Sequence, residues 1–218
     1  MTKKNLEPES VVAWQSFQDR VQLTDEQLIQ FQRYYILLKE TNDIHNLTAI
    51  TDFMSVLKYH FEDSLMLGNY TDCSKLSCIA DVGTGGGFPG IPLKIKYPHL
   101  RVILIEVNLK KRAFLQEVIE QLGLLDVEVS SLDWRTFIRK TEYPIELFSA
   151  RASLQPEELL RMFKPASPYK NSTLVYWASQ EWTPDAYVRS FITKEEQYKM
   201  SHKSRRLIFF NNPVLKNL

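Results

Sequence analysis

The chain has 218 residues, of which 44% are apolar and 24% are charged, and its formal net charge is +1. These values are ordinary for a globular protein of one sizeable domain, and the sequence shows no repeats and no low-complexity segment. A charge so close to balance provides no overall attraction for nucleic acid, although affinity for phosphate depends on where the basic residues lie.

The N-terminal segment lacks the apolar core that a signal peptide requires, and no apolar run is long enough to cross a bilayer. The only cysteines are Cys73 and Cys78, and no matching ligands elsewhere indicate a metal site. We therefore expect a cytoplasmic protein with reduced thiols, no membrane contact and no bound metal.

Residues 1–70 are predicted to form a helical N-terminal cap. Thr24 and Gln27 have the spacing of a capping box at the start of a helix. Apolar residues then repeat at helical spacing at Leu28, Phe31, Tyr35 and Leu38. A further helix is expected at about 53–67.

Residues 71–218 are predicted to form an α/β domain, because strand-like apolar segments alternate with helical ones. The expected strands are 77–82, 101–106, 127–131, 145–150 and 173–177, and the expected helices are 90–97, 109–122, 134–139 and 157–163. This alternation predicts a parallel sheet with right-handed crossovers. Two last strands, 195–200 and 207–210, indicate an antiparallel hairpin with a basic loop at 201–206. Five parallel strands and a C-terminal hairpin resemble the sheet of S-adenosylmethionine-dependent methyltransferases more than that of dehydrogenases.

Residues 81–92 hold five of the seven glycines and connect the first expected strand to a helix. A strand, a glycine turn and a helix form the first unit of a nucleotide-binding sheet. Residues 85–90 satisfy G-x-G-x-x-G, so NAD must be considered. Asp81 favours S-adenosylmethionine instead, since a carboxylate orders the loop or engages the cationic end of that ligand but repels a pyrophosphate. Pro89 also removes an N–H donor at the helix start.

Acidic and aromatic residues follow the next two strands. Glu106 ends the second strand, where an acid accepts both hydroxyls of an adenosine ribose; both cofactors contain that ribose. Asp133 and Trp134 follow the third strand, beside the adenine in such sheets, where a carboxylate accepts from the amino group and a ring stacks. Simpler explanations are a capping or solvent-facing role for Glu106 and an N-cap role for Asp133.

Several motifs across residues 24–155 carry a family resemblance. They are Asn46-Leu47-Thr48, His60-x-x-Asp63-Ser64, Asp81-Val82-Gly83-x-Gly85-x-Gly87-Phe88-Pro89-Gly90-Ile91-Pro92, Glu106 with Lys110-Lys111-x-x-Phe114-Leu115, and Ser149-Ala150-Arg151-Ala152. With these motifs the chain resembles the RsmG (GidB) family, bacterial methyltransferases that act on guanine N7 of 16S ribosomal RNA in the small subunit. The resemblance implies a Rossmann-like class I methyltransferase fold with a helical cap.

The resemblance implies S-adenosyl-L-methionine as cofactor. Together with the loop chemistry, it gives the expected cofactor-binding residues as Asp81, Gly83, Gly85, Gly87, Phe88, Glu106, Asp133, Trp134 and Arg151. The chain departs from the family pattern at Glu106, where Asp is usual, at Tyr59, where Arg is frequent, and at Trp177-Ala178, where Lys-Gly is typical. The last departure concerns contacts with the methylation target.

No catalytic residue is expected beyond those that position the reactants. Guanine N7 has an in-plane lone pair and no proton, so methyl transfer to it needs alignment and no general base. Residues 149–153 lack the Asn/Asp-Pro-Pro-Tyr/Phe motif of adenine N6 enzymes, and both cysteines stand too early in the chain to act as the nucleophile of a cytosine C5 enzyme.

The expected RNA-contacting residues are Asn46, His60, Lys110, Lys111, Arg151 and Arg205. Lys110 and Lys111 fall in the first turn of a helix, where cations oppose the macrodipole, and such breaks of a local rule concentrate at functional sites. The simpler explanation for these lysines is a solvated run of charge. Arg205 belongs to the basic hairpin loop. A loop that charged residues keep soluble at a sheet edge explains these charges as well as RNA contact does. His60 shares a helix face with Asp63 and Ser64 and either braces the cap against the glycine loop or contacts the target.

The leading hypothesis is an S-adenosylmethionine-dependent rRNA (guanine-N7) methyltransferase that acts on 16S ribosomal RNA or a small-subunit particle. One alternative is a non-catalytic RNA-binding or ribosome-assembly protein on the same fold. A less favoured alternative is an NAD-linked dehydrogenase, for which the sequence offers no clear proton-relay residue.

Overall fold

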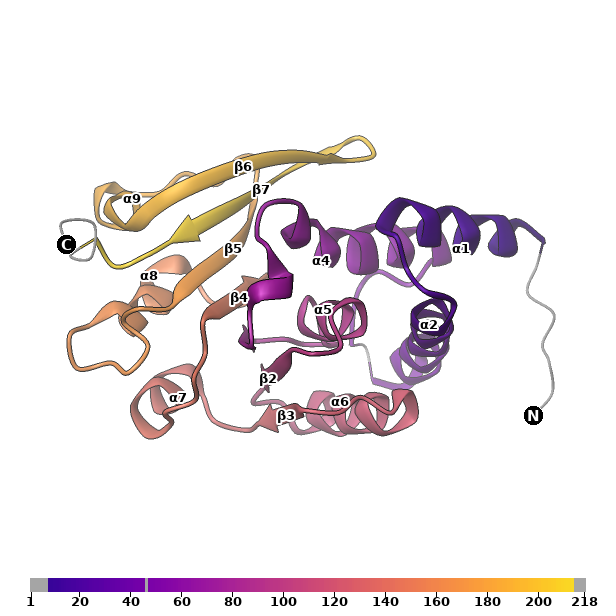
Figure 1. The fold of residues 1–218 in the computed structure, drawn as a ribbon, viewed down its shortest axis with the longest axis horizontal. Coiled ribbons are helices and arrows are strands. Elements are labelled where there is room, and N and C mark those ends of the chain that lie inside the picture. Colours follow the sequence, from indigo (N-terminus) through magenta and orange to yellow (C-terminus); the bar gives the residue numbers. More distant parts are fainter. Residues whose placement is uncertain (1–7, 46, 214–218) are drawn as a thin grey trace.

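A seven-stranded sheet runs through the centre of the molecule (Figure 1). The computed structural model describes residues 8–45 and 47–213. The strands are β1 (Cys78–Val82), β2 (Arg101–Ile105), β3 (Val127–Ser130), β4 (Leu147–Arg151), β5 (Thr173–Ser179), β6 (Ile192–Met200) and β7 (Lys203–Phe210). Their order across the sheet is β3-β2-β1-β4-β5-β7-β6. Strands β1 to β5 pair in parallel and β7 pairs antiparallel with β5 and β6, which confirms the predicted sheet.

The crossover helices lie where the sequence pattern predicts them. They are α5 (Gly90–Lys96), α6 (Leu109–Leu122), α7 (Trp134–Lys140) and α8 (Pro156–Leu159), which continues as the 3₁₀ segment η4 (Leu160–Phe163). Helix α9 (Ala186–Phe191), which was not predicted, precedes β6. Asn108 caps α6 by accepting from two N–H groups of its first turn, and Gly123 ends that helix in the left-handed conformation.

The N-terminal part of the chain is helical, as predicted. Its elements are α1 (Pro8–Val21), α2 (Asp25–His45), α3 (Phe53–Ser55), the π-helical η1 (Val56–Glu62), α4 (Asp63–Leu65), and the 3₁₀ segments η2 (Met66–Asn69) and η3 (Cys73–Lys75). The capping box is confirmed, since Thr24 and Gln27 exchange two hydrogen bonds at the start of α2. The helix expected at 53–67 is a continuous helical run with a π-helical centre, a feature that is frequent at functional sites.

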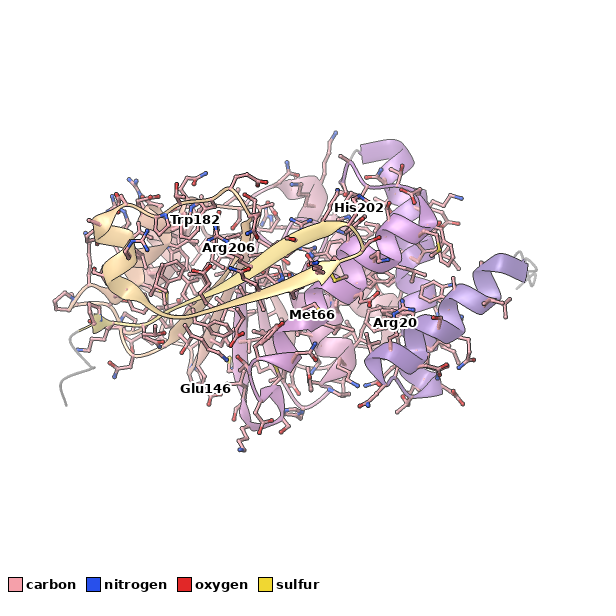
Figure 2. All side chains as sticks on the ribbon, turned by 90° about the horizontal axis from the view of Figure 1, so that it is seen from above. Arg20, Met66, Glu146, Trp182, His202 and Arg206 are labelled. Atoms are coloured by element: carbon pink, nitrogen blue, oxygen red, sulfur yellow. The ribbon has the colours of Figure 1, made fainter. Side chains whose placement is uncertain are left out.

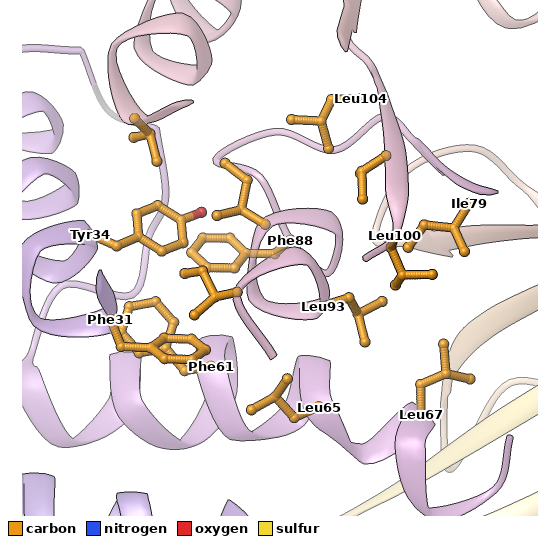
Figure 3. Packing of buried hydrophobic residues seen from close by; sticks show 14 of the residues in the cluster. Phe31, Tyr34, Phe61, Leu65, Leu67, Ile79, Phe88, Leu93, Leu100 and Leu104 are labelled. Carbon is orange, nitrogen blue, oxygen red and sulfur yellow. The ribbon is translucent and has the colours of Figure 1, made fainter. Parts of the chain in front are cut away.

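Two hydrophobic cores lie on the two faces of the sheet. Successive strand residues point to opposite faces, so Ile79 belongs to the core under the cap and Ala80 belongs to the core under α7 and α8. Phe88 of the glycine loop stacks on Tyr34 of α2, with ring centroids 5.4 Å apart, within the aromatic cluster in Figure 3. The first core therefore extends across residue 70, and the division of the chain there stays a prediction.

The hairpin differs from the prediction. Its connection is residues 201–202, while Lys203 and Arg205 lie on β7, so the basic loop expected at 201–206 was wrong. The charges form part of the strands themselves, because an antiparallel hairpin with one face in solvent accepts charged side chains on that face. Figure 2 shows the hairpin lying over the cap with His202 at its tip, and Lys203 Nζ lies 4.6 Å from the ring centre of Tyr59.

Candidate functional site

The turn that follows β1 crosses the carboxyl edge of the sheet in a conformation that requires glycine. Gly83, Gly85 and Gly87 have φ values of 65°, 61° and 96°, a region that residues with side chains rarely adopt. A Cβ atom on Gly83 would lie 2.6 Å from the Cβ of Ser153, whereas one on Gly85 would meet nothing closer than 4.0 Å. The turn is therefore packed against the segment after β4 at Gly83 and open at Gly85.

Most backbone N–H groups of this turn already have an acceptor within the protein. Main-chain carbonyl oxygens accept from the N–H groups of residues 83, 84, 87 and 88. Glu106 Oε2 accepts from the Gly85 N–H at 3.0 Å. Asp81 Oδ2 accepts from the Gly90 N–H at 2.9 Å. A bound diphosphate would meet two carboxylates where it needs free N–H donors.

Asp81 is fully buried and holds the turn from within. Its carboxylate accepts hydrogen bonds from three donors, which are Thr84 Oγ1 at 2.6 Å, Gly90 N at 2.9 Å and Ser149 Oγ at 3.0 Å. Burial raises the pKa of this carboxyl group, and the hydrogen bonds oppose that shift. Of the two roles predicted for Asp81, the contacts match the ordering of the loop.

A cavity of about 360 Å³, which we name the loop cavity, lies at the carboxyl ends of β1 and β2. It is lined by Val82, Gly83, Ile105, Glu106, Val107, Leu132, Asp133, Trp134, Arg135, Leu154 and Glu158. Its size and mostly apolar lining, with a few polar groups, are typical of small-molecule sites. It brings together four predicted cofactor residues, which are Gly83, Glu106, Asp133 and Trp134.

Glu106 is 6% exposed and connects the cavity wall to the glycine turn. Besides the Gly85 N–H, it accepts from the Asn108 N–H at 2.9 Å through Oε1. Each carboxylate oxygen has a second lone pair, so Glu106 keeps acceptor capacity toward the cavity. The additional methylene relative to aspartate lengthens the reach of the side chain toward Gly85.

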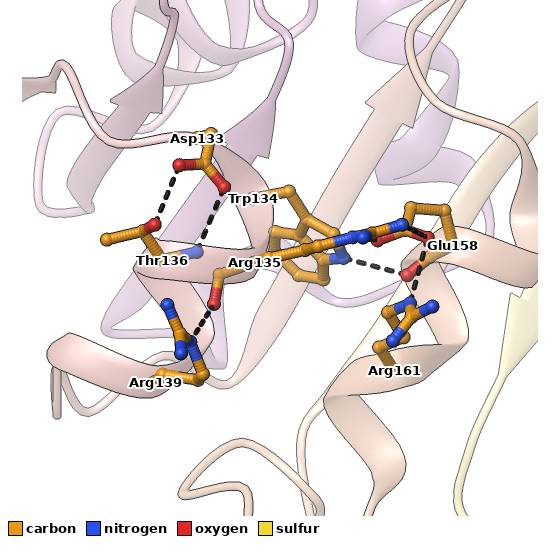
Figure 4. Close-up of polar contacts among 7 residues, drawn as sticks. All are labelled: Asp133, Trp134, Arg135, Thr136, Arg139, Glu158 and Arg161. Atoms are coloured by element: carbon orange, nitrogen blue, oxygen red, sulfur yellow. Dashed lines mark hydrogen bonds and ion pairs between the residues drawn. The ribbon is translucent and has the colours of Figure 1, made fainter.

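Asp133 and Trp134 both have structural partners (Figure 4). Asp133 is the N-cap of α7 and accepts from the N–H and Oγ1 of Thr136, which lowers the pKa of its carboxyl group. The Trp134 indole N–H donates to the Glu158 carbonyl oxygen at 2.9 Å, and its ring packs edge-on against Phe148. The capping explanation for Asp133 is therefore correct, and an adenine contact stays a prediction.

Three features of the cavity and of the glycine turn beside it fit a ligand with an adenosyl group. The buried Ser153 hydroxyl, next to Gly83, has no hydrogen-bond partner among the described residues. Val107 and Leu154 are 59% and 36% exposed at the cavity, so apolar surface there is free to be covered. Space over Gly85 remains open, and such an approach to the backbone is what glycine permits.

The sequence reasoning missed the apolar wall formed by Val107, Leu132 and Leu154, and it missed Ser153. An available signal was the position of these residues, since each follows the end of a strand at the edge where parallel sheets bind ligands. Glu158 and Arg135 were also missed, because α8 and α7 bring them to the cavity from separate parts of the chain.

A buried polar group beside the cap, which we name the Asp63 network, consists of Asp63, Arg151, His60, Thr48 and Tyr198. Asp63 Oδ2 pairs with Arg151 Nη1 at 3.0 Å, and their side chains are 1% and 13% exposed. Asp63 Oδ1 accepts from the Tyr198 hydroxyl at 2.7 Å. Burial raises the pKa of Tyr198, and the charge of Asp63 adds to that shift.

Trp177 also contacts this network, because its indole N–H donates to the Asp63 carbonyl oxygen at 3.2 Å. Trp177 lies on β5 and supplies an apolar ring and one N–H donor to the cap. The network connects α4 with β4, β5 and β6.

His60 lies between the network and the glycine loop. Its ring stacks on Phe88 with centroids 4.3 Å apart and an interplanar angle of 7°. One ring nitrogen lies 2.8 Å from Thr48 Oγ1, and the other lies 3.4 Å from Arg151 Nη2. Burial and the neighbouring Arg151 charge lower the pKa of His60 to about 3, so the ring is neutral at neutral pH. Arg151 Nη2 then donates to Nδ1, and Nε2–H donates to Thr48.

Phe88 and Arg151, both predicted cofactor contacts, belong to this region and do not line the loop cavity. Lys110 and Lys111 fall in the first turn of α6 as predicted, two and three positions after the N-cap residue Asn108. Arg205 lies on β7, and its buried Nε has no hydrogen-bond partner among the described residues. Asn46 lies outside the described residues, so its predicted RNA contact has no structural account.

The described residues include no cluster of histidine, cysteine and carboxylate side chains that could hold a metal ion. Both cysteines are buried and unpaired. No helix within the described ranges is long and apolar enough to cross a membrane.

The sheet order and the glycine turn define the class I fold of S-adenosylmethionine-dependent methyltransferases. A solved structure with this fold, the METTL16 MTase domain, superposes with a TM-score of 0.57 at 12% identity, covering 85% of this chain and 79% of that chain. At such low identity the likeness concerns the fold alone.

Sequence relatives define the family more narrowly. The model of the family described as "rRNA small subunit methyltransferase G" (GidB) matches residues 27–208, and the chain belongs to this family. A ribosomal RNA small subunit methyltransferase G from Geobacillus sp. (strain WCH70) is 42% identical over 147 residues, which cover 66% of this chain and 62% of that protein. Its counterpart from Listeria monocytogenes is 38% identical over 162 residues, covering 73% of this chain and 68% of that protein.

Proposed function

We propose that this protein is an S-adenosylmethionine-dependent methyltransferase that forms 7-methylguanosine in 16S ribosomal RNA of the small ribosomal subunit. The observation that carries the proposal is the loop cavity beside a glycine turn in which most N–H groups have acceptors within the protein. The names of the relatives support the RNA substrate, and a substrate of this kind is found in the cytoplasm.

The loop cavity supplies the groups that an adenosyl ligand needs. Glu106 retains lone pairs for the ribose hydroxyls, and Asp133 and Trp134 line the same cavity, where they can meet the adenine. Bound there, S-adenosylmethionine supplies an electrophilic methyl group, which bonds to guanine N7 as its bond to sulfur breaks and S-adenosylhomocysteine remains.

The same contacts argue against the dehydrogenase alternative. Asp81 and Glu106 occupy two N–H donors that a dinucleotide diphosphate would need, and both acids repel its charge. Glu106, Asp133 and Glu158 all line the cavity, while its one cation, Arg135, is paired with Glu158. Such an acidic lining favours a cationic sulfonium ligand.

The Asp63 network fits chemistry that needs no general base. Both ring nitrogens of His60 are engaged, and its low pKa leaves little tendency to take a proton. The Arg151 guanidinium is held by Asp63 and by the Tyr59 carbonyl oxygen. A nucleophile that carries a lone pair and no proton, such as guanine N7, requires only that the target be held in line.

Binding of S-adenosylhomocysteine, followed by isothermal titration calorimetry, tests the cofactor assignment. We expect saturable binding that Glu106→Ala weakens by about tenfold or more, since hydrogen bonds to charged groups contribute about 1.5–3 kcal/mol. A chain that binds NADH and ignores S-adenosylhomocysteine would instead be a dehydrogenase.

Transfer of labelled methyl groups tests the reaction. The acceptors are 16S ribosomal RNA as a transcript and isolated small subunits from cells that lack the protein. Mass spectrometry of nuclease digests should identify 7-methylguanosine. Binding of cofactor and RNA without transfer to either acceptor would favour the non-catalytic RNA-binding alternative.

A further inference from the structure

A second cavity of about 360 Å³, which we name the basic cleft, lies between α7 and the end of η4. It is lined by Arg135, Ile138, Arg139, Arg161 and Lys164. Four of these five side chains are cationic, in a chain whose formal net charge is only +1. The cleft is therefore a local concentration of charge that the composition does not explain.

One carboxylate serves this group of cations (Figure 4). Glu158 Oε1 pairs with Arg135 Nε at 2.6 Å, and Glu158 Oε2 pairs with Arg161 Nε at 2.8 Å. Within residues 8–45 and 47–213, Arg139 and Lys164 have no ion pair. Glu158 is thus the only carboxylate ion-paired with these cations among the described residues, and Asp133 is a second negative charge near Arg135. Four positive charges still outnumber these two, and their mutual repulsion makes the cleft favourable for an added anion.

The cleft also has unused hydrogen-bond donors. Arg139 donates only through Nε, to the Arg135 carbonyl oxygen at 3.1 Å, and Arg161 donates only through Nε, to Glu158. In the described part of the chain, the terminal nitrogens of both guanidinium groups and Nζ of Lys164 make no hydrogen bond. Forked guanidinium donors match the paired oxygens of a phosphate group, and a lysine ammonium adds a mobile point charge.

The basic cleft adjoins the loop cavity. Arg135 lines both, and Glu158, which lines the loop cavity, holds Arg135 and Arg161 of the cleft. A polymer with a phosphate at each repeat can occupy the cleft while another of its units lies at the methyl-transfer edge of the sheet. A single small anion would occupy only the basic cleft and would not extend to the loop cavity.

We propose that the basic cleft binds backbone phosphates of the RNA substrate, as a docking site beside the methyl-transfer site. This inference rests on the proposed function for the identity of the RNA. It assigns phosphate contacts to Arg139 and Lys164 in addition to the predicted Lys110 and Lys111. Phosphate contacts position an RNA without reading its sequence.

The test compares two double variants of equal charge. Arg139→Gln with Lys164→Gln removes two cations of the cleft. Lys140→Gln with Lys170→Gln removes two exposed cations, one at the last residue of α7 and one in the segment after η4, that do not line it. Binding of a 16S ribosomal RNA transcript is measured over a range of salt concentrations.

For the cleft variant, we expect the slope of log K against log salt to fall by about 1.4, since each lost phosphate contact lowers it by about 0.7 for single strands. The control pair should change the slope by less than half as much. Thermal midpoints and S-adenosylhomocysteine affinity should equal those of the wild type in both variants. A cleft variant with the wild-type slope, or a control pair with an equal loss, would overturn the docking site.

The two proposals fail separately. A wild-type protein that binds RNA through the cleft but transfers no methyl group contradicts the proposed function alone. A wild-type protein that methylates the RNA, with no salt-slope change in the cleft variant, contradicts the cleft alone.

Discussion

The loop cavity and the Asp63 network lie at neighbouring strand ends, but they are stabilised in different ways. The cavity wall depends on backbone geometry and on Glu106, which bonds to residues at most 21 positions away. The network depends on side chains far apart in sequence, since Asp63 is 88 positions from Arg151 and 135 from Tyr198. The first region leaves an open space for a ligand, and the second closes the cap onto the sheet.

The largest expected effect is a loss of unfolding free energy when the Asp63 network is disrupted while the loop cavity is left intact. Asp63→Asn leaves the buried Arg151 without its counter-charge, so we expect it to lower the free energy of unfolding by about 3–5 kcal/mol. Urea denaturation followed by circular dichroism measures the change, and calorimetry on the folded fraction should still detect S-adenosylhomocysteine.

The neighbouring carboxylate provides the control. Glu62 pairs with Arg20 at 3.0 Å at the surface, where the Arg20 side chain is 48% exposed. Glu62→Gln should therefore lower the free energy of unfolding by no more than about 1 kcal/mol. Equal losses in the two variants would mean that the Asp63 network does not stabilise the cap as a buried ion pair.

The second prediction concerns pH and the network alone. The pKa of His60 is lowered to about 3 in the folded state, from 6.5 when unperturbed. Between these values the unfolded chain binds more protons, so the contribution of a neutral His60 is complete above pH 6.5 and is lost as the pH falls. At about pH 5 the loss reaches about 2 kcal/mol.

His60→Gln removes this titration. The difference in unfolding free energy between wild type and variant should therefore shrink by about 2 kcal/mol from about pH 7 to about pH 5, measured by urea denaturation. Parallel stability curves over that interval would show that His60 titrates alike in both states.

The contrast between the regions also explains what could be predicted from the sequence. The glycine turn, the position of Glu106 at a strand end, and the parallel strands with their C-terminal hairpin follow local patterns of strand, turn and helix, and the structure confirms these elements. His60, Asp63 and Arg151 were recognised one by one, but their mutual contacts depend on chain segments that only the fold brings together. No local pattern pointed to Tyr198, because its partner Asp63 lies 135 positions earlier in the chain.

Two local patterns were ambiguous for physical reasons. The charged run at 201–206 suggested a loop, yet residues 203–206 belong to β7, and an antiparallel strand with one solvated face tolerates the same charges. The π-helical turn around His60 consists of residues that suit an α-helix equally well, so the sequence pattern does not distinguish the two.

The third prediction tests the open space over the glycine turn beside the loop cavity. Gly85 and Gly123 share a φ of 61°, but a Cβ on Gly123 has no neighbour within 4 Å and lies outside both regions. Gly85→Ala and Gly123→Ala should lower stability alike, by about 1–2 kcal/mol for the left-handed conformation. Only Gly85→Ala should also weaken S-adenosylhomocysteine binding, by about tenfold or about 1.4 kcal/mol, because its methyl group enters the open space over the glycine turn. Equal affinities would place the ligand elsewhere.

The smallest expected effect concerns Asp133, which belongs to the loop cavity and also caps α7. Asparagine caps a helix about as well as aspartate, so Asp133→Ala should cost about 1 kcal/mol of unfolding free energy and Asp133→Asn should cost almost nothing. Titration of both variants with S-adenosylhomocysteine then tests the proposed adenine contact separately from helix capping. If the side chain accepts from the adenine amino group, the alanine variant binds less tightly and the asparagine variant, which keeps an acceptor oxygen, does not. Unchanged affinity in both variants would leave Asp133 as a helix cap alone.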